Sequence, residues 1–198
     1  MPDLIQLKRH ELLTLEDYAI QRDAFRTQAI EARKARRFHF GEHFTFNFEN
    51  KVTVQYQVQE MLRIERIFEP KDIEEELSSY NPLISQGHSL RCTLFIEFED
   101  VGERQKALAT LSGVEHQFWV EVEGHSKTYA DANQDIERST DEKTSAVHFL
   151  NFKLPQSDID AFLQGANLRF GMDHDGPYAV ANQNVPSALC ETLRQDLS

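Results

Sequence analysis

The chain has 198 residues, of which 40% are hydrophobic and 27% are charged, and its formal net charge at pH 7 is −12. This length suits one domain or one and a half. The composition provides enough apolar residues for a core, which excludes a disordered protein. The negative charge argues against general nucleic-acid binding, because the chain as a whole would repel a phosphate polymer.

A long helix is predicted over about residues 15–36. Thr14 precedes an acidic first turn, and the segment ends in a basic run that includes Arg36 and Arg37. The helix dipole favours this order of charges. The basic run has two explanations: it is either a solvated helix end that complements the dipole or a docking patch for an acidic partner.

A Phe-rich β-hairpin is predicted next, because phenylalanines alternate with polar residues on both sides of Gly41 and Glu42. The phenylalanines that share one face are Phe38, Phe40, Phe44, Phe46 and Phe48. A two-residue loop would divide them between the two faces, so we expect a loop of odd length over residues 41–43. We expect the phenylalanine face to pack against the apolar side of the following helix.

That helix is predicted over residues 52–68, where apolar residues recur with a helical period. Glu65 lies near the middle of the apolar arc. We therefore expect this carboxylate to be at least partly buried and held by an arginine or a metal, unless it reaches water at the helix end. Arg63 and Arg66 lie on a separate polar face and are candidates for partner binding. A further helix is expected from Pro70 onward.

The second half follows a different pattern, in which strand, helix and strand succeed one another twice. The expected elements cover residues 90–98, 100–113, 118–122, 146–154, 156–164 and 168–172. Two such units predict an α+β protein with a ferredoxin-like (βαβ-βαβ) antiparallel sheet in its C-terminal region, residues 87–198, decorated by an arm at 123–144. The N-terminal region, residues 1–86, would be helical with the hairpin, and both regions would pack as one compact unit.

Cys92 and Cys190 are the only cysteines, too few for a disulfide framework or a four-cysteine metal site. The start of the chain lacks the pattern of a signal peptide, and no apolar run approaches the roughly 18 residues of a membrane span. We therefore expect a cytoplasmic protein. Any divalent metal would be held mainly by histidine and carboxylate.

One candidate metal site follows from the expected sheet, because strand starts and strand ends of opposite sense share an edge. It would combine His148, His174, Asp173 and His125 at one end of the C-terminal sheet. Histidine is the commonest metal ligand and a proton carrier near neutral pH, so these residues would bind a metal or serve as acid/base groups. In the alternative, His148 is a hydrogen-bonded core residue and the others are solvated turn residues.

Three strings carry a resemblance to a known family: QYQVQEMLRIERI at 55–67, YNPLI at 80–84 and KTSAVHFL at 143–150. They resemble the bacterial family called domain of unknown function 3501, and the resemblance covers nearly the whole chain. It implies partners from redox or peroxide metabolism, because family members are often encoded beside a rubrerythrin-like diiron protein and an iron–sulfur oxidoreductase related to heterodisulfide reductase. The family assigns no catalytic or binding residue.

Two functions are compatible with these observations. The first is an accessory or binding protein that docks onto redox partners through arginine or acidic surface patches. The alternative is a metal-dependent enzyme or metal-handling protein that uses the His/Asp site. Whether the histidines converge in space discriminates between the two.

Overall fold

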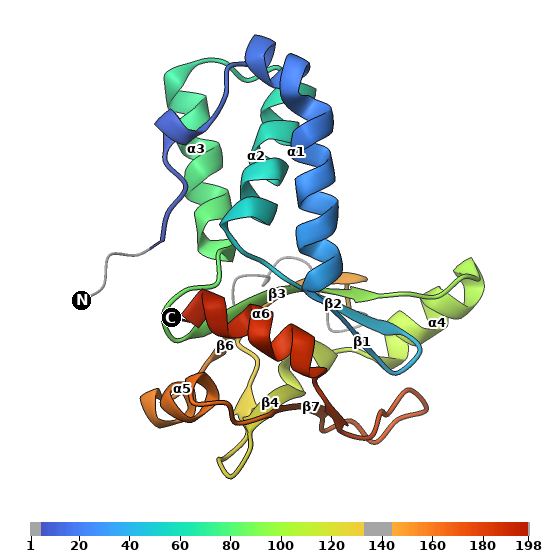
Figure 1. The fold of residues 1–198 in the computed structure, drawn as a ribbon. Coiled ribbons are helices and arrows are strands. Elements are labelled where there is room, and N and C mark those ends of the chain that lie inside the picture. The colour runs from blue at the N-terminus through green and yellow to red at the C-terminus, as the bar shows by residue number, and fades with distance from the viewer. Residues whose placement is uncertain (1–4, 133–143, 198) are drawn as a thin grey trace.

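The structure, a computed structural model, describes residues 5–132 and 144–197 of the chain. In these ranges the protein is α+β, with a lobe of helices standing on two packed β-sheets (Figure 1). None of the helices in the described ranges has both the length and the apolar character that crossing a membrane requires.

The helical lobe is built by the first part of the chain. Its elements are η1 (Arg9–Glu11), α1 (Leu15–Ala35), α2 (Lys51–Glu65), α3 (Pro70–Tyr80) and η2 (Asn81–Leu83). Thr14 caps α1 by accepting a hydrogen bond from the Asp17 N–H, as the sequence predicts. Arg66 adopts a left-handed conformation with φ 56°, so α2 ends at Glu65, earlier than predicted.

Two four-stranded antiparallel sheets form the base. Sheet A has the order β1 (Arg37–Phe40), β2 (Phe44–Phe48), β3 (Ser89–Ile96), β6 (Val147–Lys153). Sheet B has the order β5 (Thr128–Tyr129), β4 (Phe118–Val122), β7 (Leu168–Met172), β8 (Gln183–Asn184). The remaining helices are α4 (Val101–Thr110), η3 (Val114–His116), α5 (Gln156–Leu163) and α6 (Ser187–Leu197).

The hairpin prediction is confirmed. Phe40 pairs with Phe44 across a loop of residues 41–43, and Phe38 pairs with Phe46. All the hairpin phenylalanines therefore point to one face of sheet A. Gly41 has a φ of 65°, a conformation that a residue with a side chain rarely adopts, which accounts for glycine at the start of the loop.

The ferredoxin-like arrangement is wrong. In that fold β3 and β6 would be parallel neighbours in one sheet, with β4 and β7 at its edges. Here β3 pairs antiparallel with β6 in sheet A, whereas β4 pairs with β7 in sheet B. The periodicity predicts the strands and helices correctly. It does not say which sheet each strand joins. In sheet A, β2 from the predicted region 1–86 pairs with β3 from the predicted region 87–198, so the two regions share this sheet.

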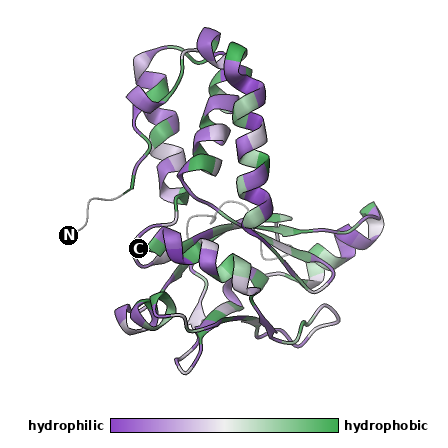
Figure 2. Cartoon of the chain, viewed as in Figure 1, coloured by the Kyte–Doolittle hydropathy of each residue, from purple (hydrophilic) through white to green (hydrophobic). Residues whose placement is uncertain are grey.

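The expected packing of the phenylalanine face on α2 is also wrong. Phe46 instead contacts sheet B, with its ring centroid 4.6 Å from that of Phe170 and 5.1 Å from that of Phe118. The apolar side of α2, including Val58, packs in a second core within the helical lobe. Figure 2 shows hydrophobic segments between hydrophilic ones along α1, which fits a helix that touches its neighbours on one side.

Candidate functional site

His148 is a fully buried residue of β6. Its Nε2 lies 2.8 Å from the hydroxyl oxygen of Thr144 and 2.9 Å from the carbonyl oxygen of Ser145. The carbonyl can only accept, so Nε2 carries the proton. The Thr144 hydroxyl in turn donates to Glu115 over 3.0 Å. This is the arrangement of the hydrogen-bonded core residue that the sequence left as an alternative.

Asp173 follows β7 and serves as an acceptor on the outer side of sheet B. It accepts from the Trp119 indole over 2.8 Å, from Lys127 Nζ over 2.8 Å and from the Tyr129 hydroxyl over 2.5 Å. Hydrogen bonds from Lys127 first, and then from Tyr129, lower the pKa of Asp173 to about 2. The carboxylate is therefore engaged with two side chains of sheet B and with Lys127, which directly precedes β5.

The two remaining histidines have separate partners. His174 Nδ1 lies 3.1 Å from Gln117 Oε1, and His125 Nδ1 lies 2.8 Å from Asp158 Oδ1 on α5. In residues 5–132 and 144–197, no three His, Cys, Asp or Glu side chains are placed so that they could hold one metal ion. The four candidates of the sequence thus do not form a common site in this part of the chain.

Glu65 is exposed, contrary to the sequence-based expectation. The last turn of α2 projects beyond the second core, and Ile64 beside it is 61% exposed. Helical periodicity places Glu65 on the apolar side of α2, but the helix ends at the left-handed residue Arg66 and its last turn is open to solvent.

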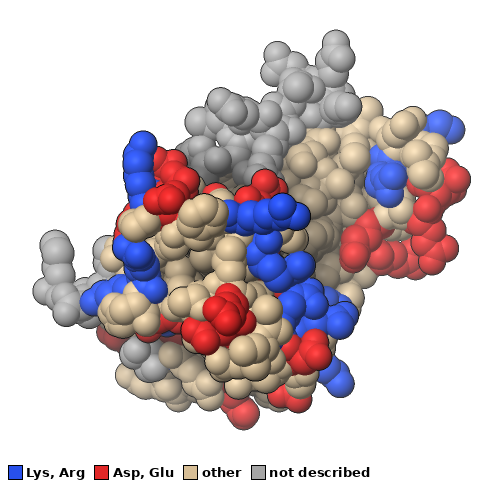
Figure 3. Space-filling view, turned by 90° about the horizontal axis from the view of Figure 1, so that it is seen from above, with Lys and Arg blue, Asp and Glu red and all other residues tan. Residues whose placement is uncertain are grey.

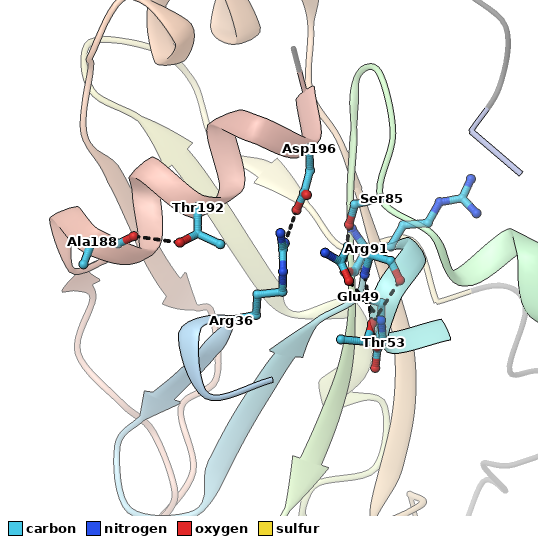
Figure 4. Close-up of polar contacts among 9 residues, drawn as sticks. Arg36, Glu49, Thr53, Ser85, Arg91, Ala188, Thr192 and Asp196 are labelled. Atoms are coloured by element: carbon cyan, nitrogen blue, oxygen red, sulfur yellow. Dashed lines mark hydrogen bonds and ion pairs between the residues drawn. The ribbon is translucent and has the colours of Figure 1, made fainter. Parts of the chain in front are cut away.

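Arg36 is not part of an exposed docking patch. It is buried and forms an ion pair with Asp196 of α6 (Figure 4). Burial raises the pKa of Asp196, and the hydrogen bond from Arg36 opposes that shift. The pair therefore ties the start of sheet A to the C-terminal helix. Arg37 is exposed, with its Nε donating to Asn47 over 3.1 Å.

A basic surface does exist on the helical lobe, and it includes the predicted candidate Arg63 but neither Arg36 nor Arg37. We call it the arginine ridge, and it consists of Arg22, Arg26, Arg33 and Arg63. The three α1 residues lie within an arc of about 40° at 100° per residue, so they form a stripe on one side of the helix. Figure 3, which looks down onto the lobe, shows Lys and Arg gathered in a band. The i, i+4, i+11 spacing on α1 was the signal available in the sequence.

Glu60 of α2 anchors this ridge. It accepts from Arg22 Nε over 2.8 Å, from the Tyr18 hydroxyl over 2.7 Å and from Arg63 over 3.1 Å. These bonds, above all the one from Arg22, lower the pKa of Glu60 to about 2. Further along α1, Arg33 lies 5.6 Å from the centre of the Tyr56 ring. One carboxylate thus serves two of the four ridge arginines.

Comparison with known proteins identifies relatives but no activity. The family described as protein of unknown function, DUF3501, matches residues 6–197. A crystal structure of a novel protein of unknown function from Burkholderia pseudomallei K96243 is similar, with 39% sequence identity and a TM-score of 0.91. That match covers 98% of this chain and 100% of the other. Among curated proteins, none matches this chain. The resemblance inferred from the three sequence strings is confirmed.

Proposed function

The chain belongs to the DUF3501 family, and we propose that it is a non-catalytic binding protein that docks onto an acidic partner protein through the arginine ridge. The observation that carries this proposal is the stripe of arginines along α1 and α2, in which Glu60 is the one carboxylate bonded to the stripe within the described ranges. The alternative, a metal-dependent enzyme, is left without a candidate ligand group in the described residues.

The ridge has the dimensions of a docking surface. Arg22 and Arg33 are 11 positions apart on α1, which corresponds to about 16 Å along the helix axis. Arg26 is exposed between them, and the side chain of Arg63 is 40% exposed. Guanidinium groups are the preferred partners of carboxylates at interfaces, because their planar geometry allows two parallel hydrogen bonds.

The net charge of the whole molecule also favours docking of an acidic partner at the ridge over docking elsewhere. The chain carries a formal net charge of −12. An acidic partner is therefore repelled by most of the surface and attracted at the ridge, so the ridge would set the orientation of docking as well as its rate.

The family resemblance suggests which partners to test first: the rubrerythrin-like diiron protein and the iron–sulfur oxidoreductase encoded beside family members. Docking onto either would make this protein an accessory factor of a redox system. Arg37 and Arg66 are also exposed and would extend the contact with a large partner.

The test is a binding measurement between the purified full-length protein and each of these two partners from the same bacterium. The double variant Arg26→Glu/Arg33→Glu reverses two ridge charges. We expect it to weaken binding about 10–100-fold. We also expect the affinity of the variant to depend less on salt concentration than the affinity of the wild type does.

The matched control is Arg104→Glu/Lys106→Glu, which makes the same change in net charge on α4. It should retain the wild-type affinity, and circular dichroism should show both variants folded. Equal weakening of binding by both double variants would show that the effect comes from the overall charge and not from the ridge. If the wild type binds neither partner, the proposal is rejected.

A further inference from the structure

An open groove of about 970 Å³ lies on the side of the helical lobe away from the arginine ridge. It is formed by the segment of residues 6–10, the end of α3, η2 and the start of β3. Four of its lining residues are basic (Lys8, Arg9, His10 and Arg91), and Glu74 is the one acidic residue that lines it in the described part of the chain. This volume is in the range of small-molecule sites.

Arg91 sets this groove apart from an ordinary solvated depression. It is a half-buried residue of β3, and its Nε is buried without a hydrogen-bond partner among residues 5–132 and 144–197. Burial lowers the pKa of Arg91, the direction expected when a cation loses water without gaining a carboxylate. Such a group is unfavourable for folding, because the lost hydration is not replaced.

The carboxylate of Glu49, a neighbour of Arg91, already has other partners. Glu49 follows β2, and its N–H donates to the Arg91 carbonyl over 2.9 Å, so the two residues are neighbours across the strands. The two carboxylate oxygens of Glu49 accept from the hydroxyls of Thr53, over 2.6 Å, and Thr93, over 2.8 Å. In Figure 4 the Arg91 side chain extends away from Glu49, toward the N-terminal segment.

The opposite wall of the groove is held firmly in place. Leu7 is buried in the second core, and its N–H and carbonyl bond to the Asn81 side chain over 2.7 Å and 3.0 Å. Lys8, Arg9 and His10 follow directly and are exposed. The fold thus positions cationic side chains on the wall that faces the Arg91 guanidinium.

From this geometry we infer that the groove binds a small organic anion, whose phosphate or carboxylate group takes the place of the missing partner of Arg91. Leu77 and Pro82 supply apolar contacts for the body of the ligand, and Lys8 and Arg9 supply a second cationic contact. This site is separate from the arginine ridge, so it stands or fails independently of the proposed docking function.

The test uses the full-length protein and two probes, inorganic phosphate and succinate, titrated by calorimetry at constant ionic strength set with sodium chloride. We expect saturable one-to-one binding of at least one probe, and the probe that binds identifies the anionic group. Arg91→Gln should weaken this binding at least about tenfold, as the loss of charge-assisted hydrogen bonds predicts.

The same variant provides a second readout that a purely structural arginine would not give. Without anion, Arg91→Gln should melt at the same temperature as the wild type or higher, because it removes a half-buried charge whose lost hydration is not replaced. When the bound probe is added, the Arg91→Gln variant should gain less thermal stability than the wild type at the same probe concentration.

Two further variants keep the result interpretable. Lys8→Gln changes an exposed residue and should weaken binding even if Arg91→Gln does not fold. Arg104→Gln on α4 should bind as the wild type does. Saturable binding of neither probe, or equal affinity of Arg91→Gln and the wild type, would overturn the inference.

Discussion

Side-chain amides hold the extended N-terminal segment against the helices. Gln59 is fully buried; its Oε1 accepts from the Leu13 N–H over 2.6 Å, and its Nε2 donates to the Leu13 carbonyl over 3.4 Å. Asn81 forms the same kind of two-bond contact with Leu7. Each amide thereby forms the two hydrogen bonds that a neighbouring β-strand would form, and it satisfies backbone groups that would otherwise lack partners.

Replacing Gln59 with leucine should destabilise the protein by about 1–3 kcal/mol, because the partly buried backbone groups of Leu13 lose their partners while the volume of the side chain is kept. Urea denaturation measures this change. Gln57→Leu, two residues earlier on the same helix and not fully buried, is the control and should cost less. Equal stability of the Gln59 variant and the wild type would show that water replaces the amide.

The longest helix, α1, depends on polar contacts to an unusual degree. It spans Leu15–Ala35, yet only Tyr18 and Ala29 are buried among its residues, and Ile20 is 79% exposed. Its attachment to α2 therefore relies on the hydrogen bonds of Glu60 with Tyr18 and Arg22 as well as on apolar burial.

The charge of Glu60 should make this attachment sensitive to acid. The pKa of Glu60 is lowered from 4.5 to about 2 in the folded protein, so its contribution is complete above about pH 4.5 and is lost as the pH falls toward 2. Glu60→Gln should destabilise by about 1–3 kcal/mol at pH 7, and the difference from the wild type should shrink over that interval.

Glu65→Gln is the control for this experiment, because Glu65 is exposed in the last turn of the same helix. It should change stability by less than about 0.5 kcal/mol at every pH. A constant difference between Glu60→Gln and the wild type from pH 7 to pH 2 would contradict the role of the charge.

The molecule as a whole has two apolar cores. One lies between sheets A and B and contains the hairpin phenylalanines together with residues such as Phe118 and Phe170. The other lies within the helical lobe and contains Val58 and Leu62 of α2. The hairpin phenylalanines are the inner layer of a sheet-on-sheet packing, rather than a platform for the helices.

A double-mutant cycle distinguishes these two arrangements. Phe46→Ala should destabilise by about 3–5 kcal/mol, the usual effect of removing a buried aromatic ring. Combined with Phe170→Ala, it should deviate from additivity by more than about 0.5 kcal/mol, because the two rings are in contact. Combined with Val58→Ala, it should be additive. Coupling to Val58 instead of Phe170 would place the phenylalanine face against α2.

Local features were predictable from the sequence because they depend on neighbouring residues. The alternation from Phe38 to Phe48 and the need to keep one face together determine the three-residue loop at 41–43. The cap at Thr14 determines where α1 begins. The three strings that resemble DUF3501 were enough to identify the family.

The tertiary structure alone decided which faces are covered. Strand periodicity is the same whichever sheet a strand joins, so only the pairing of β3 with both β2 and β6 shows that the chain builds two sheets. For a related reason, Glu65 is exposed although burial was expected, and Arg36 is buried although exposure was expected. Burial depends on elements distant in sequence, since α6 covers Arg36 and nothing in the described chain covers the last turn of α2.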